Sequence, residues 1–232
     1  MKKRLKYKTR KRMQIAALLA AYAIIALSPF GYPTTLATID HLDNLLRGKY
    51  GFTIESKVEH FLENIDENLM SRFETDGGSI VLSNTDVITM EEIESRGAKS
   101  DNAEIVNKNG GAVGTYSYKE QMIRIANKAN NRTLYHEFGH YIDRAIGVKA
   151  FGKKCSKTEA FLDITETEIR DFNKKMHAYD RSDYSLESYE LTQDAGEYFA
   201  ESFACYLMSP RYLKHVAPET FAYMDMLYNE IR

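Results

Sequence analysis

The chain has 232 residues and a formal net charge of −2, and this length suits one folded domain with its own core. Residues 1–12 hold eight of the 31 basic residues and no acidic one, so the chain from residue 38 onward carries a formal charge of −10. An acidic surface repels phosphate backbones, which makes nucleic acid a poor partner for this chain.

The N-terminal segment predicts export. Its basic cluster leads into an uncharged apolar run from Ile15 to Leu27, a break at Ser28–Gly31 and a small-residue cleavage site at Thr35–Ala37. This order is typical of a secretory signal peptide, so we expect residues 1–37 to be removed and residues 38–232 to form a secreted, extracellular domain. The apolar run is short for a membrane span, which needs about 20 residues. The alternative is an uncleaved segment that anchors the chain at the cell surface.

The first elements of the mature domain follow from periodicity. Residues 54–73 place apolar side chains at helical spacing with a charged outer face, which predicts one amphipathic helix. Residues 79–82 read Ser-Ile-Val-Leu and follow two glycines, which indicates a short strand. Residues 89–93 indicate one or two helical turns, and the polar residues 97–111 indicate a loop.

Residues 111–116 and 121–126 predict a β-hairpin. Glycine within a strand often marks the close approach of another backbone. We therefore expect an edge strand that binds an extended peptide by main-chain pairing, and its expected substrate-binding residues are Gly111, Val113, Gly114 and Tyr116. An ordinary hairpin that needs glycine for its twist is the alternative.

The next segment carries the most informative motif, H-E-x-x-H, at His136–His140. Helical positions four apart lie on one face, so His136 and His140 can present two imidazoles to one Zn²⁺. Glu137 projects beside them, where a base can reach a metal-activated water. The alternative is an ordinary helix that carries two histidines by chance. The motif therefore indicates a zinc-dependent peptidase.

The residues around this motif predict where its helix begins and ends. Asn131 or Thr133 can cap the start, and Gly147 can end it. Apolar residues between them recur at steps of three and four, which gives the helix a buried face.

Three further helices are predicted: residues 158–179, a helix from about Ala195 to Met208 that stops before Pro210, and a last helix from Pro218. The chain is therefore helix-dominated with a small mixed or antiparallel sheet and an edge hairpin, which is the α+β class.

Two acids, Glu197 and Glu201, share one face of the apolar helix at 195–208. Burying them costs free energy unless an opposite charge meets them, and a Zn²⁺ with its imidazoles supplies one. We expect Glu197 to be the third zinc ligand and Glu201 to hold a ligand histidine by its other ring nitrogen. The reversed assignment stays open, Asp143 and Asp194 are weaker candidates, and two solvated acids on an exposed face are the alternative.

Zinc catalysis also needs a donor for the oxyanion that forms at the scissile carbonyl. The polar segment at residues 180–195 offers Tyr184 and Tyr189, whose neutral phenols can donate a hydrogen bond, and His177 and His215 are alternatives. The two cysteines, Cys155 and Cys205, could pair in an exported chain, although a buried inert thiol is the commoner state for a cysteine in an apolar helix.

Four segments together resemble the catalytic domain of anthrax lethal factor and the secreted Pro-Pro endopeptidases of the same superfamily. The segments are H-E-F-G-H at His136–His140, Ser188–Tyr189, E-Y-F-A-E-S-F at Glu197–Phe203, and A-P-E-T-F at Ala217–Phe221. The resemblance covers roughly residues 50–232. It implies a zincin-type gluzincin fold in which Zn²⁺ is bound by His136, His140 and Glu197.

The resemblance also implies roles for the remaining residues. Glu137 would be the general base, Tyr189 would stabilise the oxyanion, and the glycine-bearing hairpin would pair with an extended protein or peptide substrate. The expected function is a secreted zinc metalloendopeptidase. The alternative is a surface-tethered binding protein or toxin-like module whose zinc site is structural or vestigial.

Overall fold

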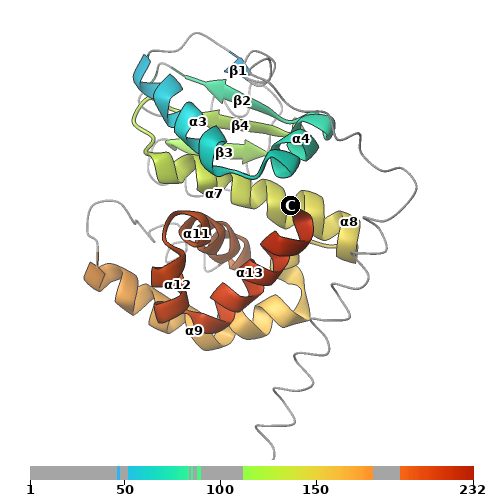
Figure 1. Cartoon of the computed structure of the whole chain (residues 1–232), viewed down its shortest axis with the longest axis vertical. Coiled ribbons are helices and arrows are strands. Elements are labelled where there is room, and N and C mark those ends of the chain that lie inside the picture. The colour runs from blue at the N-terminus through green and yellow to red at the C-terminus, as the bar shows by residue number, and fades with distance from the viewer. Residues whose placement is uncertain (1–45, 48–51, 84, 86–87, 90–111, 180–193) are drawn as a thin grey trace, which may run out of the picture.

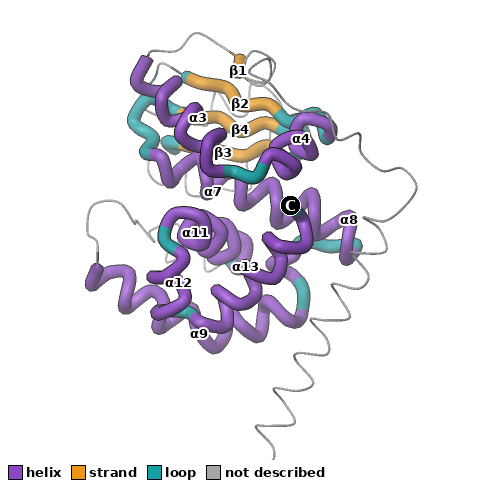
Figure 2. Tube along the Cα trace, in the orientation of Figure 1, coloured by secondary structure: helices purple, strands orange, loops and turns teal. Residues whose placement is uncertain are grey.

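The computed structural model describes residues 46–47, 52–83, 85, 88–89, 112–179 and 194–232 (Figure 1). The elements occur in this order: β1 (Leu46–Arg47), α3 (Phe52–Asn64), α4 (Glu67–Thr75), β2 (Ser79–Leu82), β3 (Gly114–Ser117), β4 (Met122–Ile125), α7 (Asn131–Tyr141), a π-helical turn (Ile142–Ile146), α8 (Gly147–Phe151), a 3₁₀ turn (Cys155–Lys157), α9 (Glu159–Tyr179), α11 (Ala195–Met208), α12 (Pro210–Val216) and α13 (Pro218–Ile231). Helices dominate this part of the chain, and the strands form one small sheet (Figure 2).

The sheet is mixed and has the strand order β1-β2-β4-β3. Strand β2 runs parallel to both β1 and β4, whereas β3 pairs antiparallel with β4. Within the described residues β3 is an edge strand, so the predicted edge hairpin is confirmed, with shorter strands than expected. The helix-dominated α+β class is confirmed as well.

The outer side of the β3 edge is partly paired already. The carbonyl of Val113 faces β4 and accepts the N–H of Ala126 at 2.8 Å. Hydrogen bonds alternate along an antiparallel ladder, so Gly114 turns its N–H and C=O to the outer side. One position earlier on that side, Ala112 exchanges hydrogen bonds of 2.7 and 2.9 Å with Ile88. Ala112 is therefore not available to an added strand. Such a strand would form its first hydrogen bonds on this edge with Gly114.

Helix α7 lies in the middle of the molecule. Helices α3 and α4 cover one face of the sheet, and α7 runs between the sheet and a second group formed by α9, α11, α12 and α13 (Figure 1). Phe138 of α7 packs edge-to-face against Phe61 and Phe73, with ring centroids 5.4 and 5.5 Å apart. Phe203 of α11 contacts the same ring from the other group, at 6.3 Å. The core thus fixes α7 from both sides.

The prediction of one helix over residues 54–73 is wrong. The chain forms two helices there, because Asp66 accepts the N–H of Asn68 at 2.9 Å and caps the start of α4. The apolar side chains keep nearly the same spacing across the break, so periodicity alone did not reveal it.

Gly147 does not end the helix that carries the H-E-x-x-H motif. The π-helical turn Ile142–Ile146 continues α7 into α8, and the chain leaves the helix at Gly152, whose φ of 69° is left-handed. Gly147 has instead a packing role, since a Cβ there would lie 2.7 Å from the carbonyl oxygen of Lys153.

The C-terminal helices agree closely with the sequence, with one addition. Helix α12 was not predicted, because Pro210 was interpreted as a stop although it occupies the first helical turn. Glu168 of α9 accepts the backbone N–H groups of Glu219 and Thr220, both at 2.8 Å, and thereby caps α13. In the part of the chain that the structure describes, we find no helix with the length and apolar character that crossing a membrane requires.

Candidate metal centre

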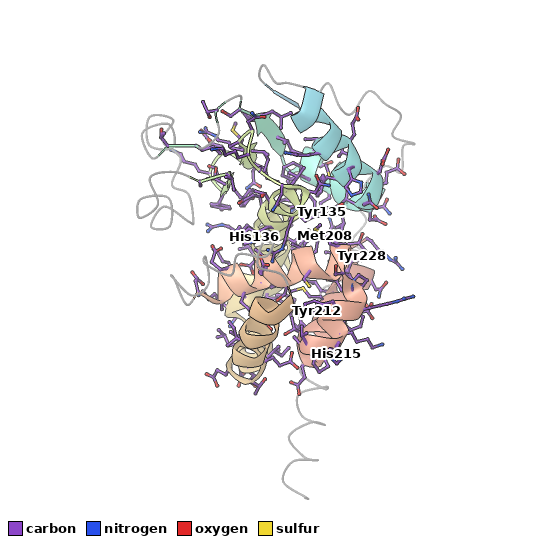
Figure 3. All side chains as sticks on the ribbon, turned by 90° about the vertical axis from the view of Figure 1, so that its left-hand side faces the viewer. Tyr135, His136, Met208, Tyr212, His215 and Tyr228 are labelled. Carbon is purple, nitrogen blue, oxygen red and sulfur yellow. The ribbon has the colours of Figure 1, made fainter. Side chains whose placement is uncertain are left out.

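Helix α7 aligns the two histidines of the motif. Asn130, and not Asn131 or Thr133, is the N-cap, and its side chain accepts the N–H of Thr133 at 2.9 Å. From this start His136 and His140 fall on one face, with their Nε2 atoms 3.1 Å apart. Figure 3 shows His136 at the level where the two groups of elements meet.

Helix α11 brings Glu197 to the same point. Asp194 caps this helix by accepting the N–H of Gly196 at 2.8 Å, so Glu197 lies in the first turn. Its carboxylate oxygens lie 3.3 Å from Nε2 of His136 and 3.4 Å from Nε2 of His140. One donor atom from each of the three residues lies within 4.8 Å of the others. Two imidazoles and one carboxylate therefore converge on one point.

A close helix crossing allows this convergence. A Cβ at Gly139 of α7 would lie 2.8 Å from the Cα and 3.0 Å from the carbonyl oxygen of Ala200 of α11. The two backbones are thus nearer to each other than a side chain at position 139 would permit. Ala200 is one turn after Glu197, so this contact sets how far the Glu197 carboxylate reaches towards the histidines.

Glu201 approaches His136 from the opposite side of the ring. Its Oε2 lies 3.2 Å from Nδ1 of His136, while its Oε1 forms an ion pair with Arg132. Glu197 and Glu201 therefore contact different nitrogens of one imidazole. The sequence predicted that these acids share a face, and the structure places both of them, buried, against His136.

Glu137 lies on the sheet side of α7, against the edge strand. A Cβ at Gly114 would lie 2.9 Å from Oε1 of Glu137 and would also collide with the methyl group of Thr133. Glycine at position 114 therefore lets the β3 backbone pass directly over the Glu137 carboxylate. The predicted base and the predicted peptide-binding edge are neighbours.

Comparison with known proteins connects this geometry to a family. The anthrax toxin lethal factor family, described as its N- and C-terminal domain, matches residues 37–227. The chain belongs to this family. The solved structure of the Pro-Pro endopeptidase PPEP-2 from Paenibacillus alvei is similar, with a TM-score of 0.56 and 21% sequence identity over 80% of this chain and 98% of that one. At this identity the likeness shows a shared fold. No curated protein sequence matches the chain.

In this member of the lethal factor family, the alternative ligand candidates have other contacts. Both carboxylate oxygens of Asp143 bind Ser156, by its N–H at 2.6 Å and its hydroxyl at 2.8 Å. Asp194 caps α11 and pairs with Lys157 at 3.1 Å. Burial raises the pKa of the Asp143 carboxyl to about 6, although the bonds from Ser156 oppose the rise. Asp143 thus holds the 3₁₀ turn Cys155–Lys157 against the π-helical turn, and Asp194 holds the start of α11.

Other sequence predictions fall outside the site or outside the described residues. Gly111, Tyr184 and Tyr189 lie outside the residues that the structure describes, and so does the side chain of His177. The prediction of an oxyanion donor therefore stays untested. Val113 is exposed, whereas the Tyr116 ring is buried and its hydroxyl donates to Gln121 at 2.9 Å. Both cysteines are buried free thiols, so they do not pair.

The charges around the three donors show which ligand fits. Glu137, Glu197 and Glu201 are 3, 4 and 6% exposed, and Arg132, which pairs with Glu201, is 7% exposed. With neutral imidazoles this set carries a charge of −2, which is costly to bury and which a divalent cation would neutralise. Burial raises the pKa of Glu197, but its interactions with His140 and His136 outweigh burial and hold that pKa below its usual value. Two imidazoles and one carboxylate are a donor set that catalytic zinc prefers.

Proposed function

We propose that the chain is a zinc-dependent metalloendopeptidase. The observation that carries the proposal is the convergence of one donor atom each from His136, His140 and Glu197 within 4.8 Å, with Glu137 between them and the edge strand. Membership of the lethal factor family and the fold shared with a Pro-Pro endopeptidase support it. His136, His140 and Glu197 would hold the zinc ion.

The residues have the following roles in the proposed reaction. A zinc ion at this point would lower the pKa of a water to about 7 and polarise the scissile carbonyl. Glu137 accepts the proton of the attacking water and returns it to the leaving amine nitrogen. Burial of Glu137 beside the β3 backbone keeps bulk water from competing for that proton. Tyr189 is the proposed donor to the oxyanion, with Tyr184 as the alternative.

The proposed substrate is a peptide in extended conformation that pairs with the outer side of β3. Ala112 is already bonded to Ile88 on that side, so pairing would begin at Gly114, directly beside Glu137. Tyr116 would contact the substrate through its backbone, because its ring is buried, and the exposed side chain of Val113 would add surface beside it. Because the similar solved structure is a Pro-Pro endopeptidase, peptides that contain Pro-Pro are the first sequences to test.

A peptide-library cleavage assay tests the proposal. The purified chain should cleave a subset of peptides, and a zinc chelator should abolish cleavage until zinc is restored. Glu137→Gln is the matched control: it should keep zinc in elemental analysis and lose turnover. If wild type binds zinc and cleaves no peptide, the alternative of a binding module with a structural metal is correct.

We also propose that the chain is exported and that residues 1–37 are a signal peptide. The basic cluster, the short apolar run and the small residues before position 38 support this. N-terminal sequencing of the protein recovered from culture medium should begin near residue 38. Recovery of the intact chain from the membrane fraction would favour the surface anchor.

A further inference from the structure

Arg132 is a buried cation next to a metal ligand. It lies four residues before His136 on α7, and therefore on the same face of the helix. Only 7% of it is exposed. A guanidinium is expensive to bury unless a carboxylate meets it, and Glu201 does so from α11. The position of Arg132 thus depends on the same acid that contacts His136.

Glu201 divides its two oxygens between these partners. Oε1 pairs with the guanidinium of Arg132, and Oε2 lies 3.2 Å from Nδ1 of His136. With Nδ1 engaged, the opposite nitrogen of the ring points to Glu197 and His140, where it lies 3.3 and 3.1 Å from their donor atoms. The orientation of the ring therefore depends on where the Glu201 carboxylate is held.

We infer that Arg132 is a positioning residue of the metal centre that acts through Glu201 on His136. The inference rests on the proposed function, because it concerns the same zinc site. Glu201 shares the site with two other buried carboxylates, Glu197 and Glu137, and repulsion from them would turn it away from His136. The rigid fork of an arginine holds a carboxylate in one orientation, which the single charge of a lysine does not.

The surroundings of Arg132 make the inference testable by truncation. Arg132 lines a cavity of about 380 Å³ together with Lys57 and Lys128. Water can enter the space that a shorter side chain leaves, so Glu201 would be hydrated and the fold should survive. Lys128 is exposed and lines the same cavity, which makes it a matched control for the loss of one positive charge.

Zinc affinity, measured by competition with a chromogenic chelator, tests the inference. Arg132→Met and Glu201→Gln should each weaken zinc binding about 10- to 100-fold, as loss of a partner of a ligand histidine does. The double variant should bind zinc as tightly as the single variant with the lower zinc affinity. Both substitutions break the same series of contacts, from Arg132 through Glu201 to His136. Arg132→Lys should recover part of the affinity, and Lys128→Met should match wild type.

The outcomes are separable. Thermal unfolding in excess chelator gives the stability of the metal-free fold, so a loss of zinc affinity at unchanged metal-free stability reports on positioning alone. Wild-type affinity in Arg132→Met, or losses that add in the double variant, would overturn the inference. If Arg132→Met does not fold, unchanged affinity in Glu201→Gln overturns it equally well. A wild-type chain that binds no zinc would instead refute the proposed function.

Discussion

Gly139→Ala tests whether the close crossing of α7 and α11 sets the metal geometry. The added Cβ would lie 2.8 Å from Cα of Ala200, and ordinary contact needs at least 3.4 Å, so the two backbones must separate by about 0.6 Å. Overpacking of this kind costs about 1–3 kcal/mol, offset by about 1 kcal/mol because alanine favours the helix. The net loss of about 0–2 kcal/mol should lower the unfolding midpoint by up to roughly 8 °C.

The same displacement should weaken zinc binding, because Glu197 lies one turn from Ala200 and would move away from both histidines. Thermal unfolding and chelator competition measure the two effects. Gly196→Ala is the matched control on α11: its Cβ would lie 3.4 Å from the nearest atom, Oδ1 of Asp194, so it should be neutral or stabilising. A Gly139→Ala protein with wild-type stability and zinc affinity would show that the crossing does not set the geometry.

Three further substitutions test other parts of the structure. Glu168→Ala removes the acceptor of two backbone N–H groups at the start of α13 and should cost about 1–2 kcal/mol in urea unfolding, at unchanged zinc affinity. Burial raises the pKa of Asp143 from 3.8 to about 6, so its contribution to stability is present below pH 4 and is lost as the pH rises through 6. The free energy of unfolding of wild type should therefore fall over this range relative to Asp143→Asn; equal profiles would contradict the assignment. Gly114→Ala should displace Glu137, which lies 2.9 Å from the new Cβ, and lower kcat/KM about 100-fold while zinc content stays unchanged.

The periodic spacing of apolar residues correctly predicted the helices that bury one continuous apolar face. Helix α11 matches its predicted range, and α13 begins at Pro218 as expected, because in both cases the apolar pattern and the boundary residue agree. The failures occur where a local contact overrides the pattern. Asp66 caps a second helix although the periodic spacing of apolar residues continues across it. Gly147 does not end a helix but allows the following turn to pack closely.

The candidate site shows the same division. The positions of His136 and His140 follow from helical geometry alone, and so does the shared face of Glu197 and Glu201. Spacing cannot show which carboxylate meets which ring nitrogen, since that depends on how α11 crosses α7. Arg132 was not anticipated, although its place four residues before His136, on a helix with a buried face, was a signal available in the sequence.

Both the close helix crossing and the buried charges affect the distance between α7 and α11. Gly139 and Ala200 bring the helices close, and that closeness places the buried carboxylates of Glu197 and Glu201 on either side of His136. Repulsion among the carboxylates favours separation, whereas a divalent cation at the three donors favours approach. With zinc bound, Gly139→Ala must therefore strain both the packing and the coordination, but without zinc it strains the packing alone. Its effect on unfolding should accordingly be smaller in excess chelator than in excess zinc, and an equal effect would mean that metal and packing are independent.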